Sequence, residues 1–271
     1  TDGYGIIARH SGSTLWGTVI TPEIIDSTGN TALAECDLEF AASYNSDTSP
    51  ELYAALSFGA IYPGAPDVPE DDIYRIECNK YGTPGNVTGL DVDPADRVNF
   101  CSLEIVGDVM IAGAYELTAA ALTPTEVWYS TNAGTSWQIA SRNPTGELLA
   151  TNRILISEYG PTTGKAFAAT GGGQSAVSIS GDDGDTWSQI ALIDDDINTI
   201  DDLAFMPGDT AAIMVTTDAA TVSSYWTTAD VTARVPGWQR DLCVGFSTTI
   251  LSFTKVAFSD DGIAVMLYDD A

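Results

Sequence analysis

An eight-residue pattern that occurs twice constrains this chain more than any other feature of its sequence. The copies occupy residues 130–137 and 180–187, and both follow Ser-x-Asx-x-Gly-x-(Ser/Thr)-Trp. The closing tryptophans, Trp137 and Trp187, stand 50 residues apart. A repeat of this length with a turn in each copy indicates an array of similar units rather than one ordinary core.

Each copy is expected to form the turn of a β-hairpin, because short strand-like runs precede and follow it. The glycines can adopt the positive φ that a Cβ would resist. The Asn or Asp side chain can accept backbone hydrogen bonds, as in Asx turns. We therefore expect structural roles for Ser130, Asn132, Gly134, Trp137, Ser180, Asp182, Gly184, Thr186 and Trp187.

This pattern resembles the Asp-box, or bacterial-neuraminidase repeat, of sialidase-like, sortilin-like and photosystem-assembly β-propellers. Degenerate copies of the pattern end at Trp16 and Trp238. The resemblance implies an all-β fold, a β-propeller of four-stranded blades, in which the box hairpin joins the outer strands away from the pocket. The box therefore predicts a turn and no chemistry.

The first half of each unit repeats as well, as a short apolar strand, a turn and a second strand. First strands are expected to begin at residues 38–43, 90–95, 154–159, 202–206 and 256–258. Together with the box hairpin this makes four strands per unit, the content of one propeller blade. The expected blades are 36–85, 86–142, 150–192 and 198–243, with a closing fifth blade from 253–271 plus 4–22. The alternative is that the chain is a piece of a longer propeller.

The net charge of the chain limits the classes of partner that it can bind. Lys and Arg number 10 against 38 Asp and Glu, so the net charge is −28. Such a chain repels nucleic acid and anionic membrane surfaces and attracts cations. No apolar run of about 18 residues occurs, so we expect no membrane span. The expected partners are proteins, through self-assembly or surface contacts, or glycans.

Cysteine usage and one sequon favour an extracellular or cell-surface location. The four cysteines are even in number, widely spaced and free of C-x-x-C pairs, which suits the disulfides of an exported protein. Cys78 and Cys101 are the candidate disulfide, with buried thiols as the alternative. Asn86 begins an Asn-Val-Thr sequon and is a candidate glycosylation site.

The resemblance makes a sialidase the first enzyme to consider. Such enzymes hold a substrate carboxylate with three arginines and use a Tyr–Glu pair and an Asp. Their Arg-Ile-Pro motif is missing here, since Arg75-Ile76 is followed by Glu77. The single histidine, His10, lies in a worn turn and is a poor base for a Ser-His-Asp triad. We therefore expect no catalytic residues.

A run of acids between two expected blades is the remaining chemical signal. Calcium takes several carboxylate and carbonyl oxygens from one loop. The candidate calcium ligands are Asp194, Asp195, Asp196, Asp201 and Asp202. The alternative is a solvated acidic loop.

These features together predict a non-enzymatic propeller that is extracellular or at the cell surface. It would serve as a structural or interaction module of the surface-layer, filament or adhesin type, with calcium as its candidate stabilising ion. One alternative is a sialidase-like or other glycan hydrolase. Another is a protein-binding propeller of the sorting or assembly type.

Overall fold

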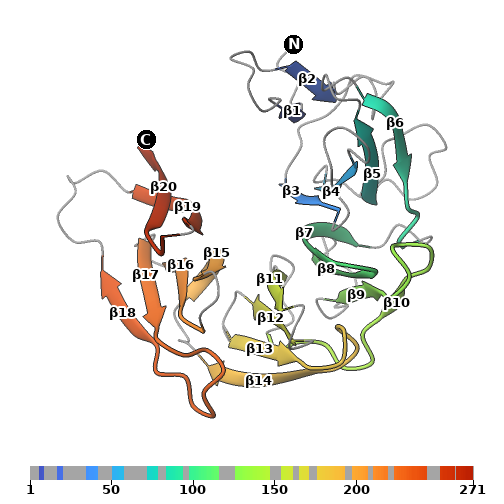
Figure 1. Ribbon diagram of the computed structural model, residues 1–271. Coiled ribbons are helices and arrows are strands. Elements are labelled where there is room, and N and C mark those ends of the chain that lie inside the picture. Colours follow the sequence, from blue (N-terminus) through green and yellow to red (C-terminus); the bar gives the residue numbers. More distant parts are fainter. Residues whose placement is uncertain are drawn as a thin grey trace. The chain divides into compact units, whose positions relative to one another are not determined.

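A computed structural model describes residues 6–8, 17–20, 35–41, 51–57, 72–78, 84–93, 98–115, 126–146, 154–160, 165–170, 176–192, 197–206, 210–218, 223–242, 251–259 and 261–270. All regular elements in these ranges are β-strands (Figure 1). The chain divides into two compact units. Unit 1 comprises Thr1–Ala121 and Trp128–Gln138, and unit 2 comprises Leu122–Val127 and Ile139–Ala271.

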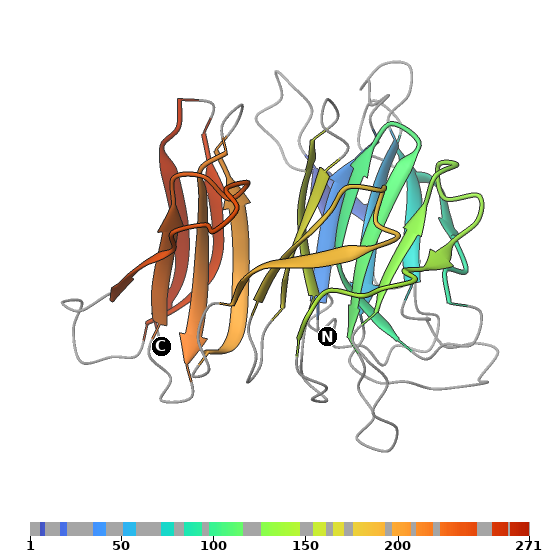
Figure 2. The ribbon, with the colours of Figure 1, turned by 90° about the horizontal axis from the view of Figure 1, so that it is seen from below.

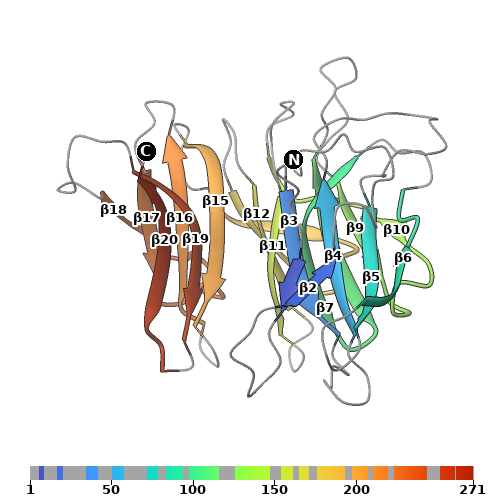
Figure 3. The ribbon, with the colours of Figure 1, turned by 90° about the horizontal axis from the view of Figure 1, so that it is seen from above.

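Four sheets each contain four strands that pair in chain order. Blade 1 comprises β3 (Glu35–Phe40), β4 (Glu51–Ser57), β5 (Asp72–Cys78) and β6 (Pro84–Gly89), which follow one another across the sheet in Figure 3. Blade 2 comprises β7 (Asn99–Val106), β8 (Val109–Tyr115), β9 (Val127–Ser130) and β10 (Gln138–Ile139).

The two later blades lie in unit 2. Blade 3 comprises β11 (Ile154–Gly160), β12 (Lys165–Thr170), β13 (Ala176–Ser180) and β14 (Trp187–Leu192). Blade 4 comprises β15 (Ile197–Phe205), β16 (Ala212–Asp218), β17 (Ser223–Thr228) and β18 (Gln239–Leu242). The predicted four-stranded, all-β units are thereby confirmed.

Two further sheets have two strands each among the described residues. They are β1 (Ile6–Ala8) with β2 (Gly17–Ile20), and β19 (Leu251–Phe258) with β20 (Ala264–Asp270). Both pairs are antiparallel. The prediction that these half-blades complete one fifth blade stays a prediction.

The first strand of blade 2 begins later than the sequence predicted. Residues 90–93 do not start a strand, because they form the turn that leaves β6. Leu90 donates its N–H to the carbonyl of Ile73 at 2.9 Å, and Asp91 has a φ of 52°. The strand itself begins at Asn99.

The core of each unit lies between neighbouring blades. In unit 1, Tyr53 and Ile73 of blade 1 pack with Phe100, Leu103 and Trp128 of blade 2. In unit 2, buried side chains of blades 3 and 4 pack together, among them Phe167, Ile200, Leu203, Met214 and Trp226. Exposure alternates along residues 37–40 of β3, because successive side chains point to opposite faces. Strands β7 and β12 are instead buried along most of their length.

Within a unit, the first strand of each later blade packs against the first two strands of the blade before it. In unit 1, β3 lies against β7, and in unit 2, β11 lies against β15 and β15 against β19. Figure 2 shows the orange strands of blade 4 running beside the red strands β19 and β20. Side chains on the first strands therefore meet their counterparts from the next blade.

Candidate functional site

A four-residue segment recurs on the first strands of the blades. It reads Asp-Leu-Glu-Phe at residues 37–40 of β3 and Asp-Leu-Ala-Phe at residues 202–205 of β15. The strand registers agree, since Phe40 pairs with Leu52 and Phe205 with Ala212, each near the start of the second strand. The segment on β3 thus has a structural equivalent on β15.

Both aspartates bind the backbone of the next first strand. Oδ2 of Asp37 accepts the N–H of Leu103 on β7 at 2.9 Å, and Oδ2 of Asp202 accepts the N–H of Val256 on β19 at 2.8 Å. Each donor strand, β7 or β19, has a register shift just before the donating residue. A carboxylate that accepts a backbone N–H forms a charge-assisted bond, which is stronger than a neutral one. We call these contacts the β3–β7 junction and the β15–β19 junction.

The two junctions differ in their electrostatics. At the β3–β7 junction, burial, Glu104 and Asp37 together raise the pKa of Glu39 to about 8. At the β15–β19 junction, the two positions that correspond to Glu39 and Glu104 hold Ala204 and Ala257. There Lys255 Nζ lies 3.7 Å from Asp202 Oδ1. The β3–β7 junction is therefore the strongly acidic member of the pair.

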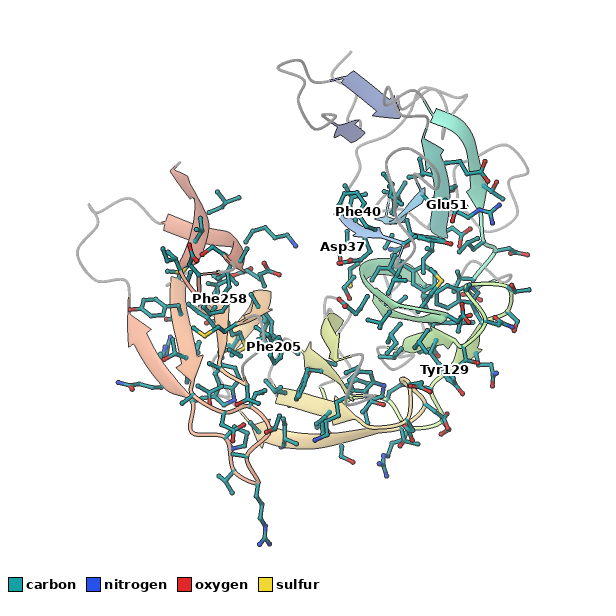
Figure 4. The ribbon with its side chains drawn as sticks, in the orientation of Figure 1. Asp37, Phe40, Glu51, Tyr129, Phe205 and Phe258 are labelled. Carbon is teal, nitrogen blue, oxygen red and sulfur yellow. The ribbon has the colours of Figure 1, made fainter. Side chains whose placement is uncertain are left out.

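The face of β3 opposite to Asp37 and Glu39 exposes apolar side chains. Leu38 is 45% and Phe40 60% exposed, and they alternate along the strand with Asp37 and Glu39. Figure 4 labels Asp37 and Phe40 on this strand, with Phe205 and Phe258 at the corresponding positions of β15 and β19. The strand thus offers carboxylates on one face and apolar surface on the other.

The acids of the β3–β7 junction were not singled out from the sequence. The shared Asp-Leu-x-Phe segment on β3 and β15 was the signal that would have found Asp37. Glu104 carries no such signal, because it becomes part of the site only through the packing of β7 on β3.

The two eight-residue copies form the same turn between the third and fourth strands of their blades. Ser130 Oγ accepts the N–H of Gly134, and Ser180 Oγ accepts that of Gly184, both at 3.0 Å. Oδ1 of Asn132 accepts the N–H of Ser136 at 3.0 Å, and Oδ1 of Asp182 that of Thr186 at 2.8 Å.

Backbone conformation and tryptophan packing complete the turns. Gly134 and Gly184 have φ values of 77° and 96°, in the left-handed region that suits glycine. Trp187 is 2% exposed and its Nε1 donates to the carbonyl of Gly184 at 2.9 Å. Trp137 is partly buried against the core of unit 1, and its Nε1 has no hydrogen-bond partner.

Asp182→Asn is expected to change the free energy of unfolding by less than about 0.5 kcal/mol, because Asn132 makes the same contact in the other copy. Asp182→Ala is expected to cost about 1 kcal/mol, since it leaves the N–H of Thr186 without its acceptor. Urea denaturation of both variants at neutral pH measures the difference. Equal stability of the two variants would contradict a role for the carboxylate as acceptor.

The acid dependence of this turn follows from the same contacts. Partial burial would raise the pKa of Asp182, but hydrogen bonds from Thr186 and Ser180 outweigh it and the pKa is lowered. A lowered folded pKa means that the contribution is present above the ordinary value of 3.8 and is lost as the pH falls below it.

Three of the four described arginines make contacts within the protein, and the fourth, Arg234, is exposed. Arg142 Nε donates to the carbonyl of Trp187 at 2.7 Å. Arg240 lies 5.3 Å from the ring centroid of Trp226 and donates to Ser224 Oγ at 3.0 Å. Arg75 forms an ion pair with Glu77 at 3.5 Å. These three guanidinium groups therefore serve contacts within the protein.

The candidate calcium ligands are only partly described. Asp194, Asp195 and Asp196 lie outside the described residues. Asp201 accepts a hydrogen bond from Thr217 Oγ1 at 2.8 Å, and Asp202 binds Val256 and Lys255 as above. In the part of the chain that the structure describes, no group of three or more His, Cys, Asp or Glu side chains is arranged to hold a metal ion. Calcium binding by this loop stays a prediction.

The candidate disulfide and glycosylation site also stay predictions. Cys101 is buried on β7 and its Sγ lies 3.4 Å from the carbonyl of Gly113, while the side chain of Cys78 on β5 is outside the described set. Asn86 lies within β6, where it pairs with Glu77, rather than in a connection between blades. Its side chain is likewise outside the described set.

No protein-family model matches the sequence, and no curated protein is significantly similar to it. Solved structures of other proteins do superpose on this chain. YCF48 bound to a D1 peptide superposes with a TM-score of 0.50 at 15% identity, over 90% of this chain and 66% of that one. A GH74 xyloglucanase from Xanthomonas campestris gives a TM-score of 0.52 at 13% identity, over 86% of this chain and 36% of that one.

A third structure, an arginine-to-alanine mutant of AofleA from Arthrobotrys oligospora, gives a TM-score of 0.60 at 11% identity, over 95% of this chain and 70% of that one. The fold is a β-propeller. The chain spans about two thirds of the YCF48 chain and about a third of the xyloglucanase. At these identities the likeness shows the fold alone, and the neighbours include both a glycosidase and a peptide-binding protein. Among the described residues, no helix is long and apolar enough to span a membrane.

Proposed function

We propose that this chain is a non-enzymatic interaction propeller of the Asp-box type that acts at the cell surface or outside the cell. Its partners are proteins, and it binds positively charged segments of those partners. The observation that carries this proposal is the acidic β3–β7 junction, where Asp37, Glu39 and Glu104 gather and the pKa of Glu39 rises to about 8. A carboxylate stays protonated at neutral pH when the local potential is strongly negative and the site is partly dry.

Two further observations support a cationic protein segment as the partner. The net charge of −28 attracts cations over distances comparable to the Debye length and speeds their association. The exposed Leu38 and Phe40 supply apolar surface on the same strand. YCF48, a propeller of the same fold, was solved with a D1 peptide bound, which supports a peptide as a ligand for such a scaffold.

Three of the four described arginines are used in contacts within the protein, which supports the absence of a sialidase-like site. Arg142 and Arg240 are used in contacts to Trp187 and Trp226, and Arg75 is used in an ion pair. A substrate carboxylate would have to compete with these contacts. A surface-layer, filament or adhesin role remains the context in which we place the interaction, and calcium at residues 194–202 remains part of the proposal.

The test is binding of synthetic Lys/Arg-rich peptides to the immobilised chain, beside peptides in which Gln replaces every cation. We expect retention of the cationic peptides alone and its loss at high salt, because exposed charges are then screened. Glu104→Gln should weaken binding more than Asp108→Asn, which removes the same charge from an exposed turn. Repeating the assay in EDTA tests the calcium contribution.

Three results would contradict the proposal. They are equal retention of cationic and neutral peptides, equal effects of the two substitutions, and release of reducing sugar from xyloglucan or sialosides by the chain. The last result would instead establish the glycan-hydrolase alternative.

A further inference from the structure

The β3–β7 and β15–β19 junctions share one backbone contact and differ in the charges around it. In each, an aspartate accepts the N–H of the next first strand, at 2.9 Å for Leu103 and 2.8 Å for Val256. Of the two junctions, the β3–β7 junction adds carboxylates, while the β15–β19 junction adds the ammonium of Lys255. The chain therefore contains its own control for the effect of these charges.

The groups around Glu39 are mostly acidic on every element packed against it. Its own strand contributes Asp37 and β7 contributes Glu104. The neighbouring strand β4 contributes Tyr53, which pairs directly with Glu39, and Glu51. Burial and Glu51 raise the pKa of Tyr53, so this phenol is neutral at physiological pH. Arg75 lies one strand further away, on β5, and forms an ion pair with Glu77.

A proton on Glu39 removes the cost of placing a third negative charge in this junction. Like charges that are close and partly buried repel strongly, and burial further disfavours the ionised form. When β3 separates from β7, Glu39 regains solvent and its ordinary pKa of 4.5. Opening therefore releases a proton, and rising pH favours it between about 4.5 and 8. Above that range both states are ionised and the effect levels off.

We propose that the β3–β7 junction is a proton-operated latch, in which protonated Glu39 lets the Asp37–Leu103 hydrogen bond hold blades 1 and 2 together and loss of the proton loosens them. The β15–β19 junction does not respond in this range, because alanines stand at the positions of Glu39 and Glu104 and Lys255 forms an ion pair with Asp202. The latch lies within unit 1 and operates whether or not a partner is bound.

Amide hydrogen exchange of the full chain tests the latch. The readout is the protection of the Leu103 N–H divided by that of the Val256 N–H, measured from pH 5 to pH 9. The ratio cancels the intrinsic pH dependence of exchange. One proton coupled to opening changes the opening constant by up to about tenfold per pH unit, so we expect the ratio to fall at least tenfold across the range.

Two variants separate the latch from other effects of pH. Glu39→Gln keeps the shape of the protonated side chain and cannot ionise, so the ratio should become independent of pH. Ala204→Glu and Ala257→Glu, combined with Lys255→Ser, move the acidic arrangement to the β15–β19 junction and should make protection of Val256 fall with rising pH. A wild-type ratio that does not change with pH, or a Glu39→Gln variant that keeps the full change, overturns the proposal.

Discussion

Trp187→Ala is expected to lower the free energy of unfolding by about 3–5 kcal/mol, the usual cost of deleting a large buried aromatic side chain. Trp187 is 2% exposed in blade 3, and its Nε1 donates to the carbonyl of Gly184. The substitution leaves a cavity and removes the partner of that carbonyl. Denaturation in guanidinium chloride, followed by circular dichroism, measures the loss.

Trp137→Ala is the matched control for this prediction. Trp137 ends the other copy of the pattern, but it is only partly buried and its Nε1 has no partner. We expect Trp137→Ala to lower the free energy of unfolding by clearly less than Trp187→Ala does. Equal losses for the two variants would show that burial and the Nε1 hydrogen bond of Trp187 contribute little.

Asp72→Ala is expected to destabilise unit 1 by about 2–3 kcal/mol, because it leaves two backbone donors in a buried region without their acceptor. The carboxylate of Asp72 is 5% exposed and accepts the N–H of Asp91 at 2.9 Å and of Val92 at 3.1 Å. These bonds hold the turn between blades 1 and 2. Thermal and urea denaturation at pH 5 measure the effect.

The same carboxylate also predicts a dependence on pH. Burial raises the pKa of Asp72 to about 6, although hydrogen bonds from Val92, Asp91 and Ile73 oppose the rise. Because the folded pKa exceeds the ordinary 3.8, the folded state holds its proton more tightly, and stability falls as the pH rises from 3.8 to about 6.

Asp72→Asn mimics the protonated carboxyl and isolates this dependence. The difference in unfolding free energy between wild type and Asp72→Asn should change between pH 4 and pH 6 and stay constant from pH 6.5 to pH 8. A difference that is constant from pH 4 upward would mean that Asp72 does not change its pKa on folding.

The sequence predicted the local parts of this fold well. The hydrogen bonds within the turn at residues 180–187 join residues at most four positions apart, such as Thr186 to Asp182 and Gly184 to Ser180. Such contacts depend on the order of residue types alone. The period of the repeat then indicated four-stranded blades, because each blade is one local meander of strands.

Strand boundaries near a blade connection were predicted less well. Residues 90–93 are apolar and acidic in alternation, which predicts a strand, but they form a turn held by Asp72, about 20 residues earlier in the chain. The sequence around Leu90 carries no sign of that partner. A buried acceptor on β5 decided the conformation.

The sequence by itself determined the two turns, the strand content of the blades and the acidity of the chain, because these follow from neighbouring residues and from composition. The tertiary structure alone decided where the acidity is concentrated. Asp37 and Leu103 are 66 positions apart, and Glu39 and Glu104 affect one another only because β3 packs on β7. The sequence contains 38 acids, and burial beside two other carboxylates distinguishes Glu39 from the solvated majority.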